Sequence, residues 1–160
     1  MNALSNTVSV QLLEFQEQYA SDFARLNYEW LETYFTVEPH DREMLDAPNE
    51  YIIQPGGRIF FAKVEDEIVG TVALIVETPD TFELAKMGVT PKYKGLKIGK
   101  MLMQHAISEA RKAGMKRLVL ESNTKLTAAL NLYINSGFKV APLNECSPYA
   151  RCNIRMELTL

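Results

Sequence analysis

The sequence has little of what marks a metalloprotein, a secreted protein or a membrane protein. Its 160 residues include two cysteines and two histidines, without a C-x-x-C pair or a histidine pair at metal-ligand spacing, so we expect no metal site. No apolar run approaches the roughly 20 residues of a membrane-spanning helix. The first ten residues, MNALSNTVSV, lack the basic and then apolar layout of a signal peptide. We therefore expect a cytoplasmic protein without a membrane partner, in which Cys146 and Cys152 are reduced.

The sequence also lacks an excess of basic residues. The 17 basic and 20 acidic residues give a formal net charge of -3, which argues against nucleic acid as a partner. Apolar residues are plentiful, at 47% of the total, which is enough for a sizeable core at this length. The sequence has no internal repeat, low-complexity segment or linker, so it predicts one domain over residues 1–160.

Hydrophobic periodicity predicts a mixture of strands and helices. Strands are expected at 8–15, twice within 58–77 around the turn Glu65-Asp66-Glu67, at 81–90, at 117–122, and within 138–142 and 152–158. Helices are expected at 21–35, as one or two short pieces in 39–53 broken around Pro48, at 98–113 and at 126–136. Because a strand–helix–strand unit follows a hairpin, we expect a mixed α/β sheet with helices on both faces.

Positive charge is concentrated where a strand gives way to a helix, in the stretch KYKGLKIGKM at 92–101. Between Glu83 and Glu109 there is no acidic residue, and there are five lysines, at positions 86, 92, 94, 97 and 100. The free N–H groups and the dipole at the start of a helix favour an anion, so this stretch predicts a phosphate site. The alternative is an ordinary basic helix start whose glycines serve the turn.

Two common phosphate motifs fail in this stretch. A Walker A loop needs G-x-x-x-x-G-K followed by Ser or Thr, whereas GLKIGKM has one spacer too few and Met101 in place of the hydroxyl. A Rossmann fingerprint needs three glycines directly after the first strand, and this loop has only Gly95 and Gly99, late in the chain. A nucleotide-binding regulator is therefore disfavoured.

Taken with its flanks, MGVTPKYKGLKIGKMLMQHA, the loop resembles that of the GNAT superfamily of acyl-CoA-dependent N-acetyltransferases. The family loop has Gln or Arg, two residues, Gly, one residue, and then Gly or Ala; Lys94, Lys97 and Gly99 occupy these three positions here. A second family signature, Ala, then Tyr four residues on, then Gly-Phe, is present as AALNLYINSGF. The resemblance covers nearly the whole chain. It implies a mixed, mostly antiparallel sheet that is splayed at a bulge, and a transferase that uses acetyl-CoA.

The resemblance also assigns residues to acetyl-CoA. Pantetheine would pair with the strand edge at Met87, Gly88 and Val89, where a backbone N–H would polarise the thioester carbonyl. Backbone N–H groups of the loop would hold the pyrophosphate. This loop consists of Lys94, Gly95, Leu96, Lys97, Ile98, Gly99 and Lys100. Asn123 and Ala129 are further candidates, Asn123 because Leu126 stands where the family often has an asparagine.

Two side chains match catalytic groups of the family. Glu83 lies six residues before Val89, where some members have a glutamate as general base; the alternative is a solvated charge at the end of a strand. Tyr133 matches the tyrosine that protonates the CoA thiolate; the alternative is a core tyrosine.

The expected acceptor is an amine of a small molecule or a peptide. The family architecture favours acceptor contacts from Asn27, Trp30, Glu121, Tyr149 and Arg151. Glutamates suit a cationic amine whereas Arg151 suits a carboxylate, so the sequence leaves the charge of the acceptor open. Dimers are common in the family, which makes a homodimer one expectation. The alternative to an enzyme is a non-catalytic acyl-CoA-binding or sensor module on the same fold.

Lys97 departs from the family pattern, because the family has a glycine there. A left-handed backbone would cost a lysine about 1–2 kcal/mol. We therefore expect an ordinary helical backbone at this position, with the ammonium adding a charge contact to a phosphate. The alternative is a strained backbone whose cost that contact offsets.

Overall fold

A seven-stranded sheet forms the centre of the computed structural model, which describes residues 9–93, 95–143 and 148–160. The strands are β1 (Val10–Glu14), β2 (Arg58–Val64), β3 (Glu67–Thr78), β4 (Thr81–Val89), β5 (Arg117–Ser122), β6 (Lys139–Ala141) and β7 (Ile154–Thr159). Their order across the sheet is β1-β2-β3-β4-β5-β7-β6. All neighbours are antiparallel except β4 and β5. The predicted mixed and mostly antiparallel sheet is confirmed.

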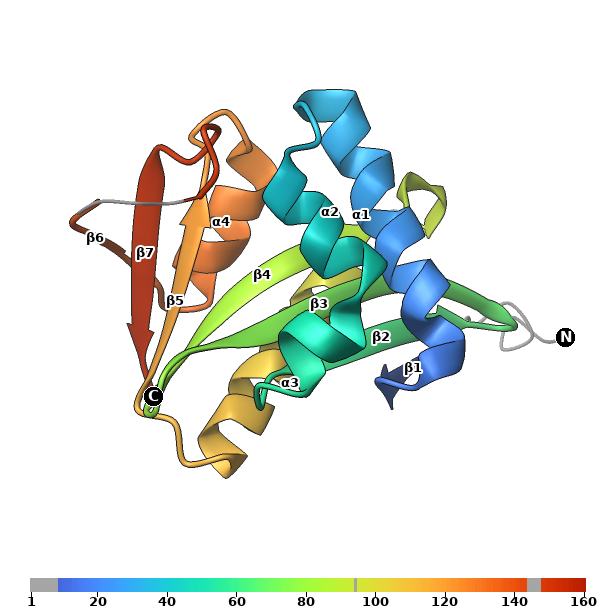
Figure 1. The fold of residues 1–160 in the computed structure, drawn as a ribbon, viewed down its shortest axis with the longest axis horizontal. Helices are drawn as coiled ribbons and strands as arrows, with labels where there is room; N and C mark the ends of the chain where they lie inside the picture. The colour runs from blue at the N-terminus through green and yellow to red at the C-terminus, as the bar shows by residue number, and fades with distance from the viewer. Residues whose placement is uncertain (1–8, 94, 144–147) are drawn as a thin grey trace, which may run out of the picture.

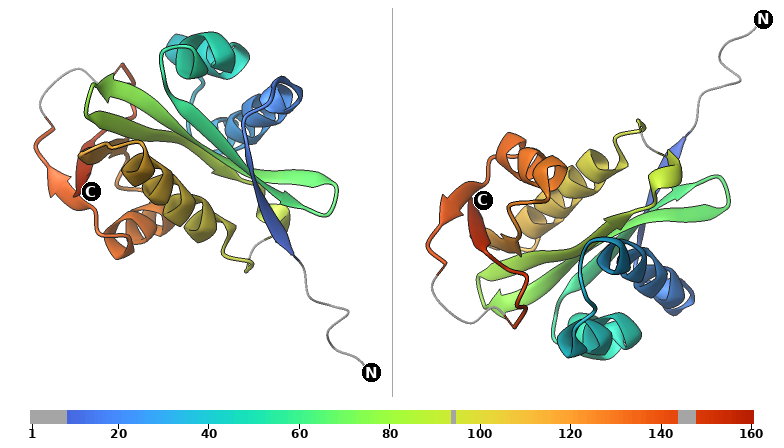
Figure 2. Two further views of the ribbon diagram at one scale, coloured as in Figure 1. Left: turned by 90° about the horizontal axis from the view of Figure 1, so that it is seen from below. Right: turned by 90° about the horizontal axis from the view of Figure 1, so that it is seen from above.

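Helices cover both faces of the sheet, as the sequence predicts. On one face lie α1 (Ala20–Tyr34) and α2 (Pro39–Asp46), and on the other lie α3 (Ile98–Lys112) and α4 (Thr127–Asn135) (Figure 2). Each face has its own apolar core: Phe23, Leu26 and Leu31 of α1 are buried on the first, and Leu102 and Met103 of α3 on the second. In the described part of the chain, no helix has the length and the apolar character needed to span a membrane.

The predicted breaks between elements are mostly confirmed. The hairpin turns between β2 and β3, and a π-helical turn (Asn49–Ile53) follows α2 after Pro48. The polar residues at the start of the helical pattern also predict a cap of α1 at Ser21 or Asp22, and this prediction is wrong. A 3₁₀ turn, Glu17–Tyr19, runs directly into the helix, because the N–H of Ala20 donates to the carbonyl of Glu17. The helix therefore begins without a side-chain cap.

The strands β4 and β5 are paired at one end only. Their parallel ladder joins Thr81–Glu83 to Arg117–Val119, although β4 continues to Val89. Beyond Glu83, β4 and β5 diverge (Figure 1). On the other side of β4, the register between β3 and β4 shifts near Thr71 and Ala73. In the same segment Lys86 has a φ of 54°, which is unusual for a residue with a side chain. The predicted splay at a bulge is confirmed, and it exposes an edge of β4.

Gly88 is the point where α1 approaches this divergent part of β4. A Cβ atom at Gly88 would lie 2.9 Å from the carbonyl oxygen of Leu26 and 3.1 Å from Cδ1 of Trp30. Only a glycine fits such a contact without a shift of the helix. A glycine inside a predicted strand indicates a bulge or a close approach, and the close approach is confirmed at Gly88. It positions Trp30 beside the opening between β4 and β5.

Candidate active site

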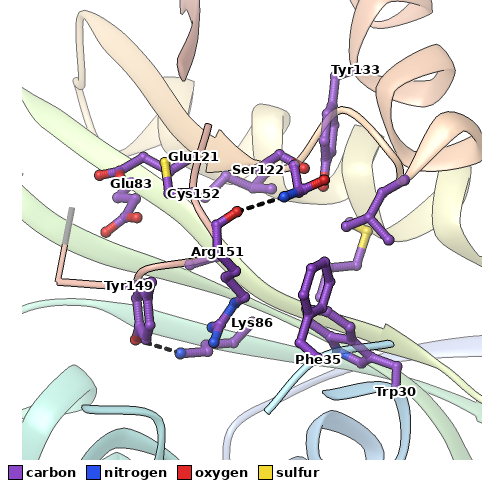
Figure 3. Close-up of a pocket in the computed structure, with 15 residues that line it drawn as sticks. Trp30, Phe35, Glu83, Lys86, Glu121, Ser122, Tyr133, Tyr149, Arg151 and Cys152 are labelled. Carbon is purple, nitrogen blue, oxygen red and sulfur yellow. Dashed lines mark hydrogen bonds between the residues drawn. The ribbon is translucent and has the colours of Figure 1, made fainter. Parts of the chain in front are cut away.

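A pocket of about 680 Å³, counting the part that opens to solvent, lies where β4 and β5 diverge. Its walls come from Trp30 of α1, the middle of β4, the end of β5, Tyr133 of α4 and the segment 149–152 (Figure 3). Segments far apart in the sequence therefore meet at this opening in the sheet.

Glu83 is the last residue of β4 that pairs with β5, opposite Val119. It also pairs with Ile75 of β3, whose side chain packs in the core under α1 and α2. Burial raises the pKa of Glu83, and the negative charges of Glu121 and Glu77 raise it further, from 4.5 to about 7. A carboxyl group with such a pKa exchanges a proton near neutral pH, as a general base must.

Glu121 of β5 lies beside Glu83 on the same side of the pocket (Figure 3). Its Oε1 is 3.8 Å from Nη1 of Arg155. Its Oε2 is buried and has no hydrogen-bond partner among the residues that the structure describes. Arg155 makes its shorter contact elsewhere, because Nη2 donates to Oε1 of Glu77 at 3.1 Å. The carboxylates on this side are thus incompletely neutralised.

Tyr133 lies on the opposite side of the pocket from Glu83 (Figure 3). It comes from α4, and its ring packs edge-on against Phe138 at 6.1 Å between ring centres. Burial raises the pKa of its hydroxyl, and the Ser122 side chain partly opposes this effect. The hydroxyl therefore stays protonated at neutral pH and can donate a proton.

Beside the pocket lies a buried ionic cluster that the sequence did not predict. We name it the Asp41 cluster; it comprises Glu38, Asp41, Lys86, Tyr149 and Arg151. The Asp41 carboxylate is fully buried and accepts hydrogen bonds from Lys86 Nζ at 2.9 Å and from Arg151 Nη1 and Nη2 at 2.9 and 2.7 Å. Burial would raise the pKa of Asp41, but the bonds from Arg151 and the Glu38 backbone and the charge of Lys86 lower it to about 2.

The other members of the cluster connect β4, α2 and the segment 149–152. Lys86 Nζ also donates to the hydroxyl of Tyr149 at 2.6 Å. Arg151 Nη1 donates to Oε2 of Glu38 at 3.3 Å, and its guanidinium stacks 4.2 Å from the centre of the Tyr149 ring. The side chain of Lys86 is only 5% exposed. These contacts hold one wall of the pocket in place.

A groove lies at the start of α3, on the other side of Trp30 from the pocket. It is lined by Val89 at the end of β4, by Gly95, Lys97 and Gly99 of the loop, and by Trp30, which also lines the pocket. The first-turn N–H groups of α3 lie here, and such groups favour an anion. The groove and the pocket together form a path from the loop to Glu83 and Tyr133.

The expected backbone at Lys97 is wrong. Lys97 precedes α3 with φ 58° and ψ 35°, which is a left-handed conformation. The reason is that the chain must turn sharply between Gly95, itself at φ 89°, and the first turn of the helix. The glycine usual in the family takes this conformation without strain. The lysine side chain is exposed along the groove.

The five lysines counted from the sequence do not form one phosphate site. Lys86 points into the Asp41 cluster, and Lys92 pairs with Oε1 of Glu67 at 3.1 Å. Lys97 lines the groove, and Lys100 lines a separate hollow between α3 and α4 with Arg111. Lys94 lies outside the described residues. Lys86 and Lys92 therefore do not line the groove, because a count of lysines along the sequence ignores where their side chains point.

Several predicted site residues do line these two hollows. Those in the pocket are Glu83, Met87, Glu121, Asn123, Tyr133, Tyr149, Arg151 and Trp30. Those in the groove are Val89, Gly95, Lys97, Ile98 and Gly99. The Asn123 side chain bonds within the protein, donating to the carbonyl of Arg151 at 2.8 Å and accepting from the N–H of Lys125 at 2.9 Å. Its expected contact with the cofactor stays a prediction.

Other predicted residues lie away from the pocket lining. Asn27 is fully buried in α1, where its Oδ1 accepts from Trp30 Nε1 at 3.3 Å, so it positions the tryptophan. Gly88 is buried under α1. Ala129 is half-buried on α4, four residues before Tyr133, and Leu96 packs at the edge of the core. Asn27 therefore reaches the site only through Trp30.

Sequence reasoning missed Asp41, Lys86 and Arg155. A signal for Asp41 was present, because it lies four residues before Leu45, which places an acid on the apolar face of a helix. Within the described residues, no group of histidine, cysteine, aspartate and glutamate side chains is arranged to hold a metal ion.

Comparison with known proteins bears on the family and the fold. The sequence profile of the acetyltransferase (GNAT) family matches residues 24–138. An uncharacterized N-acetyltransferase of Escherichia coli is 32% identical over 116 residues, which cover 70% of each chain. A probable N-acetyltransferase of Xenopus tropicalis, camello, is 33% identical over 61% of this chain and 46% of its own, so the chain spans less than half of that relative.

Solved structures share the fold. A GNAT-family acetyltransferase from Staphylococcus aureus superposes with a TM-score of 0.85 at 21% identity, covering 94% of this chain and 99% of that one. The PaiA N-acetyltransferase of Thermoplasma acidophilum, solved with coenzyme A, superposes with a TM-score of 0.75 at 19% identity over 95% and 99% of the two chains. The family profile covers well over half of the chain, and the chain belongs to the acetyltransferase (GNAT) family.

Proposed function

We propose that the protein is an N-acetyltransferase that moves an acetyl group from acetyl-CoA to an amine of a small molecule or peptide. The observation that carries this proposal is the divergence of β4 from β5, which opens a pocket with Glu83 on one side and Tyr133 on the other. A carboxyl group with a pKa near 7 and a protonated phenol are the two proton-transfer groups that the reaction needs.

The groove fits a long ligand with a diphosphate at one end. First-turn N–H groups of α3 and the exposed ammonium of Lys97 favour anionic oxygens. Among the residues that the structure describes, no strand pairs with the edge of β4 from Met87 to Val89 on its β5 side, so this edge offers backbone groups to an extended ligand such as pantetheine. Acetyl-CoA, when bound, supplies the activated acyl group.

The residues of the pocket then account for the proton balance of acetyl transfer. The amine nitrogen forms a bond to the carbonyl carbon of the thioester, and the carbon–sulfur bond breaks. Glu83 takes the proton that the amine loses, and Tyr133 gives its proton to the departing sulfur. The products are an amide and the free thiol of CoA, and solvent restores both side chains.

Ligand binding gives the first test. Acetyl-CoA should raise the melting temperature, because a ligand that binds only the native state stabilises it. ATP and NAD at the same concentration should raise it much less, since neither carries a pantetheine arm for the edge of β4. Equal shifts from all three ligands would contradict the assignment of the groove to CoA.

Catalysis gives the second test, read by thiol release with a panel of amines. Tyr133→Phe and Glu83→Gln should each lower kcat by about 10²-fold, because each removes one proton-transfer group. Tyr51→Phe is the matched control, since Tyr51 is exposed in the π-helical turn, and it should leave the rate unchanged. If acetyl-CoA binds but no amine releases thiol, the protein is a binding module and not an enzyme.

A further inference from the structure

The two charged groups of side chains in the pocket differ in how well their charges are balanced. On one side, Lys86 and Arg151 face Asp41 and Glu38, so two cations meet two carboxylates. On the other side, the ion pairs that the structure describes for Glu77 and Glu121 are both with Arg155, and Glu83 feels only the charges of Lys86 and Arg155, without an ion pair to either. This imbalance bears on which acceptor the pocket accepts.

The balanced side is closed to a carboxylate from a substrate. Arg151 donates to both oxygens of Asp41 and to Glu38, and Lys86 donates to Asp41 and to the Tyr149 hydroxyl. A substrate carboxylate would have to displace Asp41, which is fully buried and would keep its charge. Leaving a buried charge without its partner is strongly unfavourable.

On the other side, the carboxyl groups of Glu83 and Glu121 can still accept a positive charge or hydrogen bonds from N–H donors. Glu121 Oε2 is buried without a partner among the described residues, and Oε1 has only the 3.8 Å contact with Arg155. The Glu83 side chain forms no ion pair or hydrogen bond in the described part of the chain, although it is largely buried and lines the pocket. Buried carboxylate oxygens in native proteins are normally hydrogen-bonded, so Oε2 of Glu121, beside the Glu83 carboxyl, points to a ligand.

We propose, on the basis of the acetyltransferase function above, that Glu121 binds a second cationic group of the acceptor, which is an aliphatic diamine. The reacting amino group lies at Glu83, and the second ammonium lies at Glu121. The pocket lining also carries apolar surface from Leu84, Ala85 and Leu126, which suits a short methylene chain folded within the pocket. An amino acid is disfavoured because its carboxylate would meet Glu121 and would find Arg151 already bonded to Asp41.

Three matched acceptors test this in the intact chain. 1,4-Diaminobutane, 1-aminobutane and 4-aminobutanoate present the same amine with a cationic, a neutral and an anionic far end. We expect kcat/KM to fall in that order, by at least about tenfold from the diamine to the monoamine. The Glu121→Gln variant should bring the ratio of diamine to monoamine close to one. Glu14→Gln, which removes an exposed carboxylate on β1, should leave the ratio unchanged.

Equilibrium binding separates this inference from the acetyltransferase assignment. 1,4-Diaminobutane should bind to the protein saturated with CoA more tightly than 4-aminobutanoate, and Glu121→Gln should abolish the difference while the melting temperature of the CoA complex stays unchanged. If acetyl-CoA binds and amines release thiol, but the anionic acceptor equals or exceeds the diamine, the acetyltransferase assignment stands and the diamine inference is wrong. A failure of acetyl-CoA to bind would overturn both.

Discussion

Two lysines of this protein share an unusual backbone conformation but differ in the burial and the contacts of their side chains. Lys86 in β4 has φ 54°, and Lys97 before α3 has φ 58°, both in the left-handed region. The Lys86 side chain is 5% exposed and bonds to Asp41 and Tyr149. The Lys97 side chain is exposed, and the structure gives it no hydrogen bond or ion pair within the described residues.

The comparison distinguishes two cases of backbone strain. At one lysine, contacts of the side chain within the fold offset the strain, and at the other the described residues provide no such contacts. At Lys86 the left-handed residue turns β4 away from β5 and directs the ammonium to a buried carboxylate. At Lys97 the same conformation directs an ammonium into an open groove beside the start of a helix. Strain held at a functional site usually belongs to its mechanism. Lys86 thus belongs to the framework of the pocket, whereas the Lys97 ammonium lies at the open groove, where we propose that it contacts a phosphate of CoA.

The largest effect is expected at the centre of the framework. Asp41→Ala leaves Lys86 and Arg151 buried without their shared carboxylate, which should lower the free energy of unfolding by about 3–5 kcal/mol. Urea denaturation measures this. Asp46→Ala, at the exposed end of the same helix, where Asp46 accepts from the Tyr28 hydroxyl, should lower it by less than about 1 kcal/mol. Equal effects of the two substitutions would show that the contacts of Asp41 do not stabilise the fold enough to offset the backbone strain at Lys86. Lys86 would then not differ from Lys97 in this respect.

A smaller effect is expected at Glu83, the carboxyl group that the framework leaves unpaired. Its pKa is about 7 in the folded state against 4.5 unfolded, so its neutral form stabilises the native state. That contribution is complete below pH 4.5 and is lost as the pH rises through 7. Relative to the wild-type protein, Glu83→Gln should therefore gain about 2–3 kcal/mol in unfolding free energy between pH 4.5 and pH 8. A difference that does not change with pH would show that Glu83 is solvated.

The smallest effect on stability is expected at Lys97. Lys97→Gly should stabilise the protein by at most about 1 kcal/mol, because relief of strain is partly offset by the greater freedom of glycine in the unfolded chain. Acetyl-CoA binding should weaken, by an amount that shrinks as salt screens the lost charge. Calorimetric titration at two salt concentrations measures this.

Lys86→Gly is the matched comparison for that variant. It relieves the same backbone strain but removes a buried partner of Asp41, so it should destabilise the protein. Tighter acetyl-CoA binding by the Lys97→Gly variant at every salt concentration would show that the lysine is a defect of the loop and not a ligand.

The local parts of this fold could be predicted from sequence because their signals are local. The turn at Glu65–Asp66 separates two apolar strands, and Gly114 ends α3 at φ 79°. The apolar face of α3 was predicted less well. Helical spacing predicts a buried face that includes Met101 and Ala113, but these two residues are only half-buried, whereas Met103 and Ile107, which lie off that face, are buried. The spacing of apolar residues predicts the helix, but it does not predict exactly which of its residues are buried.

Family motifs direct attention to Glu83, Tyr133 and the loop at 94–100, and of these residues Glu83 and Tyr133 line the pocket while Gly95 and Lys97–Gly99 line the groove. Lys86 could not be predicted, because nothing in TFELAKMGVT shows that a lysine inside a strand takes a left-handed backbone. Nor does the sequence show that residues 41, 86 and 151 converge. The open question of whether Arg151 faces a substrate carboxylate therefore had no answer before the contacts of Asp41 were known.

The connectivity of the Asp41 cluster has a consequence for the order of folding. Asp41 bonds to residues 45 and 110 positions away along the chain. Closing such long loops costs more entropy than forming the hairpin of β2 and β3, so these bonds should form after the main barrier. Substitutions in the cluster should then mainly speed unfolding and leave the folding rate nearly unchanged. The wall of the pocket that faces the acceptor would be the last to assemble and the first to open.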